Sequence, residues 1–321
     1  MTIVLRLALY LDLAAAFGVA MFGLYALGND ERSSTISRRY RVLIGASAAI
    51  GIVLSMWGMT VMAKAMSGAQ SYAELSTHVF DMLITGTHMG IAWCIRILAL
   101  VTCVLIAVLR MNSTLRFAAM AASSGVALAT LAWAGHGAMD DGVRGYIHLA
   151  SDITHLWAAG AWVGALIAFL VLAANKPNTG QGSVEILSRT SNGFARIGTV
   201  IVAALVVTGA LNYLLIAGPS LDPLFSTLYG RLLVGKLLLF GGMLALAAAN
   251  RFRLSPSLEA ALRTGNHAHA VVKLRQSLFT EATLAVLVLA SVAWLGILFS
   301  QRHLILDWHQ MTAHELNVMH G

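Results

Sequence analysis

Long apolar runs, separated by short polar segments, dominate the chain from end to end. A helix that crosses the hydrocarbon core of a bilayer needs about 20 apolar residues, and eight runs have roughly that length. They span residues 3–27, 42–63, 80–109, 115–135, 146–174, 194–217, 229–250 and 279–299. The first run is longer than the core of a signal peptide and lacks a small-residue cleavage site, so we interpret it as a retained helix. The pattern predicts an all-α membrane protein, a polytopic bundle of about eight transmembrane helices.

The composition supports this class of protein. Of the 321 residues, 58% are hydrophobic and 11% are charged, whereas soluble domains carry about 25% charged residues. No proline-rich or serine-rich linker interrupts the chain, so residues 1–321 are expected to form a single transmembrane domain. The sequence also lacks a nucleophile elbow, an H-E-x-x-H pattern and a G-x-x-x-x-G-K-[ST] loop. We therefore expect neither an enzyme nor an ATP-driven pump.

Basic residues gather in alternate loops, and this sets the expected orientation. Four loops are rich in basic residues, and these residues are Arg32, Arg38, Arg39 and Arg41; Arg110 and Arg116; Lys176 and Arg189; and Arg251, Arg253, Arg263, Lys273 and Arg275. The other loops hold little beyond Lys64 and Arg144. Because cytoplasmic loops carry the excess of Lys and Arg, both termini are expected on the outer side, the periplasm if the membrane is a bacterial inner membrane. The net charge of +7 then reflects loop anchors and gives no support to nucleic-acid binding.

In this orientation, most of the histidines and methionines lie on the same side of the membrane. Nine of the 11 His, all but His267 and His269, and nine of the 14 Met lie on or near the outer side. Imidazole binds Cu, Zn, Ni and Fe, whereas thioether sulfur is soft and selects Cu(I). A surface that mixes the two ligand types favours copper over zinc and leaves Cu(I) and Cu(II) both open.

Four groups of candidate ligands stand out, and the first is a stripe of methionines. Met56, Met59, Met62 and Met66 lie at the outer end of the second run with spacings of 3, 3 and 4. On a helix these spacings confine the four side chains to an arc of about 120°. Such a stripe suits a Cu(I)-binding surface and an apolar core face equally well.

The second group lies at the start of the third run and consists of His78, Asp81, His88 and Met89. Asp81 and His88 are seven residues apart and would share one face of a continuous helix. A carboxylate near the membrane needs a partner, which could be Arg96 or a bound cation.

The third and fourth groups flank the loop after the fourth run. His136 and Met139 precede two aspartates, a combination that suits a metal site or a solvated loop. His148, Asp152 and His155 follow with spacings of 4 and 3 and therefore share one helix face. Asp152 could orient a metal-binding histidine, or the trio could be a polar contact between helices.

Other polar residues inside the runs are expected to be structural. Lys236 lies five residues from Arg231, so both are expected to extend outward along the helix. Glu281 is expected to anchor the cytoplasmic end of the last helix. The stretch G160-A-W-V-G164 has the spacing of a small-residue packing motif.

Several stretches resemble the CopD family of bacterial copper-resistance membrane proteins. They are G86-T-H88-M-G90-I-A-W93-C-I-R96, F194-A-R-I, T208-G-A-L-N212, L228-Y-G-R231-L-L-V-G-K236, A249-N250-R251-F-R and the late Glu281. The resemblance is most recognisable over residues 80–300, whereas the outer tail, 301–321, contains His and Met without a regular pattern.

The resemblance implies copper handling, usually discussed as uptake across the inner membrane from a periplasmic copper carrier, CopC. Two other hypotheses stay open at this stage. His88 and His155 could ligate a b-type haem from separate helices. Alternatively, the chain could be a copper sensor or assembly factor that transports nothing.

Overall fold

The computed structural model describes the backbone of residues 2–134, 142–174, 181–264 and 268–319. Side chains are described within these ranges, apart from residues 33, 134, 181–183, 223, 229 and 297–319. The helices are α1 (Ile3–Tyr25), α2 (Thr35–Ser67), α3 (Thr77–Gly86), α4 (His88–Val108), α5 (Ser113–Ala129), α6 (Gly142–Ala173), α7 (Gln181–Ala217), α8 (Asp222–Ser226), α9 (Leu228–Ala249), α10 (Ser255–Thr264) and α11 (Ala268–Met319). Three 3-10 turns, η1 (Glu31–Ser33), η2 (Tyr72–Glu74) and η3 (Thr130–Ala134), and a π-helical segment, η6 (Asn250–Leu254), complete the elements used below.

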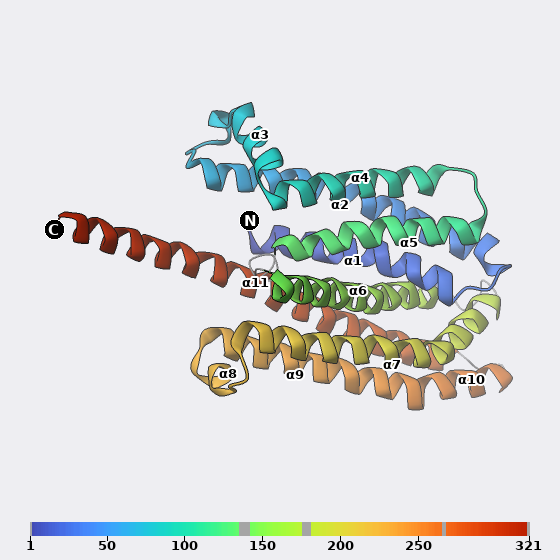
Figure 1. Ribbon diagram of the computed structural model, residues 1–321. Coiled ribbons are helices and arrows are strands. Elements are labelled where there is room, and N and C mark those ends of the chain that lie inside the picture. The colour runs from blue at the N-terminus through green and yellow to red at the C-terminus, as the bar shows by residue number, and fades with distance from the viewer. Residues whose placement is uncertain (1, 135–141, 175–180, 265–267, 320–321) are drawn as a thin grey trace.

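Eight helical segments within the described part of the chain are long and apolar enough to cross a membrane. They are Ile3–Tyr25, Thr35–Ser67, His88–Val108, Ser113–Trp133, Gly142–Ala173, Val184–Ala217, Gly230–Thr264 and Ala268–Gly296. Figure 1 shows these helices running side by side, with the N-terminus, α3 and α8 at one end of the bundle. The predicted all-α bundle of eight spans is therefore confirmed.

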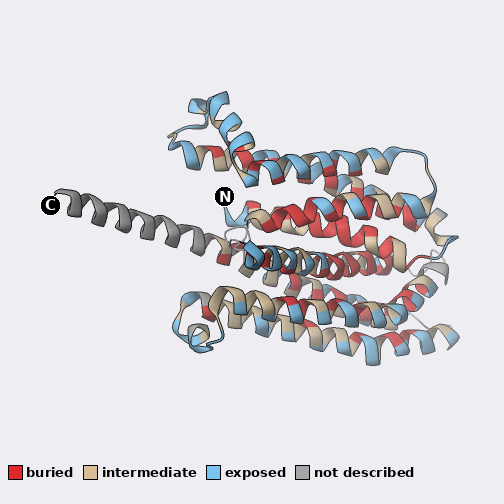
Figure 2. Ribbon diagram, viewed as in Figure 1, coloured by how far each residue is buried: buried red, intermediate tan, exposed pale blue. Residues whose placement is uncertain are grey.

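Helix α1 is the centre of the bundle because it packs against α2, α5, α6 and α11. Figure 2 shows that burial concentrates on α1, α5 and α6. Leu13, Val19 and Phe22 of α1 are fully buried. The outward faces of the other helices carry exposed apolar side chains, as a lipid-facing surface requires. Examples are Val53, Leu98, Val200, Leu238 and Phe279.

Glycines set the closest contact in this core, between α1 and α6. A Cβ atom added to Gly164 would clash with the backbone of Gly18, and one added to Gly18 would clash with Gly160. The predicted packing motif G160-A-W-V-G164 therefore acts as expected, because only glycine lets the two backbones approach this closely.

The third predicted span, 80–109, is interrupted. Thr87 adopts an extended conformation (φ −130°, ψ 144°) between α3 and α4, and its hydroxyl oxygen accepts a 2.9 Å hydrogen bond from the Gly90 amide, which caps α4. Gly90 lies against the Leu83 carbonyl, where a Cβ atom would clash. The chain therefore turns at Thr87, and α3 lies as a short separate helix at the end of the bundle.

We expect Gly164→Val to destabilise the protein by about 1–3 kcal/mol because the added side chain must force α1 and α6 apart. The matched control is Gly241→Val on α9, where an added Cβ atom meets nothing within 4 Å. Unfolding midpoints of the two purified variants in the same detergent measure the difference. Equal midpoints would refute the assignment of this contact to the core.

Candidate functional site

Polar side chains from five helices form a layer inside the bundle, referred to below as the polar layer. Its members are Tyr10, Arg96, Asp152, His155, Thr208, Asn212 and Lys236. With a helical rise of 1.5 Å per residue, Arg96 and Lys236 each lie about 12 Å along the axis from the first residue of their helices. Tyr10 and Thr208 lie at about the same depth, roughly 10–14 Å from the helix ends on the N-terminal side of the bundle. The layer is therefore intramembrane.

The contact of α6 with α7 defines the chemical state of His155. Its Nδ1 atom lies 2.8 Å from the hydroxyl oxygen of Thr208. The same hydroxyl lies 2.5 Å from the Ala204 carbonyl, to which it can donate its single proton. This arrangement favours the His155 tautomer that carries its hydrogen on Nδ1 and a lone pair on Nε2. This is the arrangement in which a histidine is oriented for metal binding by its other ring nitrogen.

Asp152 lies one helical turn from His155 and also faces α7. Asn212 donates a 2.7 Å hydrogen bond from its side-chain amide to the Asp152 carboxylate. Residues three apart on a helix have neighbouring side chains, so the imidazole and the carboxylate lie on the same side of α6. The prediction that Asp152 and His155 share a face is confirmed, and α7 is the helix that they meet. His148, the third predicted member, is buried, with 1% of its surface exposed.

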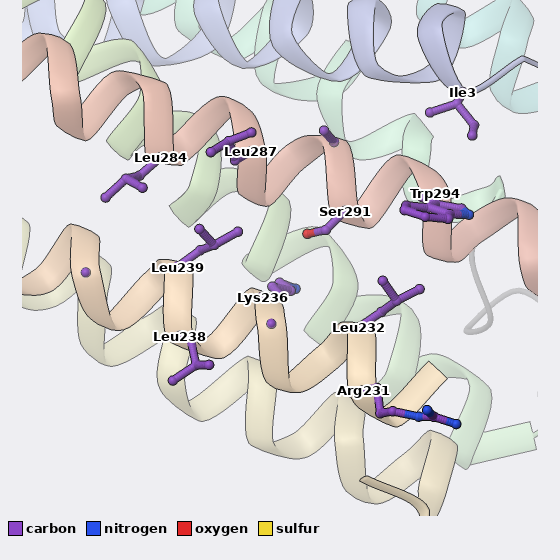
Figure 3. A pocket seen from close by; sticks show the side chains of 13 residues that line it. Ile3, Arg231, Leu232, Lys236, Leu238, Leu239, Leu284, Leu287, Ser291 and Trp294 are labelled. Atoms are coloured by element: carbon purple, nitrogen blue, oxygen red, sulfur yellow. The ribbon is translucent and has the colours of Figure 1, made fainter. Parts of the chain in front are cut away.

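Lys236 on α9 supplies a positive charge to this region. It interacts electrostatically with both Asp152 and His155. Arg231, five residues earlier, has an exposed side chain, so the two residues do not extend outward together as predicted. Both line an open, largely apolar pocket of about 720 Å³ between α9 and α11, which Figure 3 shows with Leu232 between them.

Arg96 is bound on the other side of the layer, by the end of α5. Its Nε atom donates to the Thr130 hydroxyl at 2.8 Å, and a second nitrogen donates to the Thr130 carbonyl at 3.4 Å. Arg96, Arg6 and Asp152 all act electrostatically on Tyr10. Arg96 therefore bonds Thr130 and not Asp81, the partner that the sequence suggested; its predicted structural role stays a prediction.

The second predicted group does not share a helix. Asp81 lies on α3 and His88 begins α4, because the chain turns at Thr87 between them. The expected common face of Asp81 and His88 is therefore wrong. His78, Asp81, His88 and Met89 are all exposed at the end of the bundle where the N-terminus lies.

The methionine stripe divides between two environments. Met59 is 5% exposed and packs with Ala63 and Leu83 in a small apolar cluster, with Met62 partly buried against it. Met56 and Met66 are 50% and 63% exposed.

The remaining predicted ligands, His136 and Met139, lie outside the described residues. Within the described ranges, no three His, Cys, Asp or Glu side chains converge as a ready metal site.

Glu281 is not an anchor at the end of its helix. Its side chain is 3% exposed and lies in the interior of the bundle. It accepts 2.9 Å hydrogen bonds from the Trp162 indole and from the Asn250 amide. The expectation failed because sequence position along α11 does not reveal which helices cover the residue.

The polar partners on α7 were not predicted as site residues. Thr208 and Asn212 are four residues apart inside an apolar run, so they share a face. They were noted only as part of the family-like stretch T208-G-A-L-N212. The spacing of two polar residues within one span could have identified that face, but not the helix that it meets.

The fold and the polar layer define a polytopic α-helical membrane protein with ionisable groups in its interior. Comparison with family models places residues 1–146 in the N-terminal domain of copper resistance protein D-like proteins and residues 188–295 in copper resistance protein D. The chain belongs to the copper resistance protein D (CopD) family. No solved structure matches it.

Three curated relatives agree with this assignment. The chain is 48% identical to copper resistance protein D of Pseudomonas syringae pv. tomato over 93% of its own length and 96% of that protein. It is 27% identical to inner membrane protein YebZ of Escherichia coli over 80% and 85% of the two chains. It is 28% identical to copper transport protein CutJ of Bacillus subtilis over 76% of this chain and 44% of that one. The chain is thus a copper-resistance-type protein of the inner membrane, as predicted.

We expect Thr208→Val to destabilise the protein by about 1–3 kcal/mol, because His155 Nδ1 then loses its buried hydrogen-bond acceptor. The control Thr102→Val removes a hydroxyl on the exposed face of α4 that bonds only its own helix, and its effect should stay within about 0.5 kcal/mol. Unfolding midpoints in detergent measure both. A loss of similar size in the two variants would contradict the assigned role of Thr208.

Proposed function

We propose that this protein accepts copper on the periplasmic side and carries it across the inner membrane through the polar layer. One observation carries the proposal: inside the bundle, His155 bonds Thr208 through Nδ1, which favours a lone pair on Nε2, and it shares a helix face with the Asp152 carboxylate. Family membership and the printed name of the Bacillus relative support copper as the cargo.

The donor set suits a passing copper ion. Imidazole binds copper in either oxidation state, and the carboxylate supplies a negative charge that favours a cation. A permeation site must bind weakly enough to release its ion, so two ligands on one helix face suit a transit site better than a closed cage does. In the copper-free protein Lys236 balances the charge of Asp152, and an incoming cation would take over that role.

We assign initial capture to the exposed ligands at the outer end of the bundle. His78, His88 and Met89 are exposed there, and Met56 and Met66 are exposed on α2. Of the other predicted ligands, His148 lies one helical turn before Asp152 on α6, whereas His136 and Met139 lie outside the described residues. A periplasmic carrier of the CopC type is the proposed donor, since this end is where such a protein would meet the chain.

The haem hypothesis is not supported by the positions of its two histidines. His88 is the first residue of α4 and is exposed, whereas His155 lies in the polar layer about 12 Å deeper. Two axial ligands of one haem iron must lie at the same depth, so this pair does not fit.

We expect His155→Ala to lower copper flux into sealed proteoliposomes by about tenfold or more, an effect of the size seen when metal-site residues are lost. His269→Ala, an exposed histidine at the start of α11, is the matched control and should retain wild-type flux. Wild-type flux in His155→Ala would refute the assigned route. A wild-type protein that binds copper but passes none would instead favour the sensor or assembly-factor hypothesis.

The proposed orientation predicts which loops react with an impermeant thiol reagent in intact cells. With Cys94 and Cys103 replaced by Ala, Ser71→Cys between α2 and α3 should be labelled, because this end faces the periplasm. Arg110→Cys, in the basic loop after α4, should be labelled only after the membrane is permeabilised. The reverse pattern would invert the orientation.

A further inference from the structure

Glu281 of α11, near the middle of the apolar segment Ala268–Gly296, is a buried acid that lies outside the polar layer. Its two carboxylate oxygens accept from different helices: Trp162 Nε1 of α6 donates to one at 2.9 Å, and Asn250 Nδ2 donates to the other at 2.9 Å. Trp162 and Asn250 are themselves 3% and 8% exposed. Both donors are neutral, so their hydrogen bonds to the carboxylate oxygens are not accompanied by a positive charge.

Among the described residues, the charged groups on the elements packed against Glu281 lie away from it. Lys236 is 14 residues, or about 21 Å, from Asn250 along the same helix, and Asp152 is about 15 Å from Trp162 along α6. Arg6 of α1 packs at Gly296, about 22 Å along α11 from Glu281. Two further buried or half-buried groups on these elements are His148, which is 14 residues or about 21 Å from Trp162 along α6, and Tyr25, which stacks on Phe194. The other charged or titratable groups described on them are His155, which bonds Thr208; Tyr10 in the polar layer; Asp12, which faces α2 at Gly51; Arg251, which donates to Thr199; the Glu259–Arg263 pair on α10; and the exposed Arg144, Tyr146, Arg231, Arg253, His269, Lys273 and Arg275.

A carboxylate buried in this way is costly, because desolvation is not offset by a nearby cation. The neutral acid, which carries a proton, avoids that cost. The inner half of the bundle therefore favours a protonated Glu281 as long as no positive charge approaches it.

Asn250 is suited to both protonation states of Glu281. In the arrangement described, its amide nitrogen donates to the carboxylate, while its own Oδ1 atom is buried without a hydrogen-bond partner in the described part of the chain. A rotation of the amide would place Oδ1 opposite the carboxyl group, where it can accept from a protonated acid. Asn250 also begins the π-helical segment η6, and such segments occur frequently at functional sites.

We propose that Glu281 is a proton-binding site that ionises as a copper ion moves inward from the polar layer. The O–H bond of the carboxyl group breaks, the proton passes to water at the inner end of the bundle, and the carboxylate balances the charge of the cation. Proton binding again resets the site once the ion has left. The coupling to copper rests on the proposed function, whereas the proton on Glu281 does not.

Infrared spectroscopy of the full chain in lipid bilayers tests the proton directly. The copper-free wild-type protein should show the carbonyl stretch of a protonated carboxylic acid that shifts in D₂O and disappears in Glu281→Gln. Glutamine keeps the size of the side chain and can still bond Trp162 and Asn250. The control Glu259→Gln removes an exposed carboxylate paired with Arg263 and should leave the band unchanged. A wild-type spectrum without this band, or a band of undiminished intensity in Glu281→Gln, would overturn the site.

Addition of Cu(I) to the same samples tests the coupling, with copper binding measured in parallel. The wild-type band should decrease as copper binds, and Glu281→Gln should bind copper but lose copper flux. An unchanged band at full copper occupancy, or wild-type flux in Glu281→Gln, would overturn the coupling. A protein that binds no copper would overturn the proposed function, and the copper-free spectrum would still decide whether Glu281 holds a proton.

Discussion

Hydrocarbon surrounds this bundle and offers no hydrogen-bond partner, so every polar side chain inside it must be satisfied by the protein itself. Asp152 and His155 of α6 accordingly bond Asn212 and Thr208 of α7. Lys236 of α9 interacts electrostatically with the same region. The close crossing of α1 and α6 at Gly18 and Gly164 gives these contacts a rigid base. The chemistry of the site follows, because the Thr208 hydroxyl also bonds the Ala204 carbonyl, which favours donation from His155 Nδ1 and leaves Nε2 available.

The two halves of the bundle differ in which partners their buried charged groups have. Toward the N-terminal end, acid and base occur together: Asp152 lies near Lys236, and Arg96 is bound by Thr130. Deeper along α11, Glu281 has two neutral donors, Trp162 and Asn250, and no adjacent cation within the described residues. A cation that passed from the first half to the second would leave a region that contains Arg96 and Lys236 and reach one in which Glu281 can provide a negative charge by releasing its proton.

The sequence predicted the eight spans well because apolar length is a local property that the bilayer demands of each helix. It failed where the outcome depended on a single residue, as at Thr87, whose capping of α4 separates Asp81 from His88. It also could not show which helices meet. The spacing of His148, Asp152 and His155 predicted a shared face, but the partners Thr208 and Asn212 emerge only when α7 packs against α6. Glu281 was misplaced for the same reason, since Trp162 and Asn250 are distant from it in sequence. The stretches that resemble the CopD family supply residues to both polar sites: Thr208, Asn212 and Lys236 to one, Asn250 and Glu281 to the other.

On the proposed route, copper enters the interior of the bundle at His155. Anomalous scattering at the copper absorption edge, recorded from crystals of the copper-loaded full chain, locates the bound ion. A peak is expected within bonding distance of His155 Nε2, between α6, α7 and α9. Copper confined to the exposed histidines and methionines at the end of the bundle, with no peak beside His155, would contradict this route.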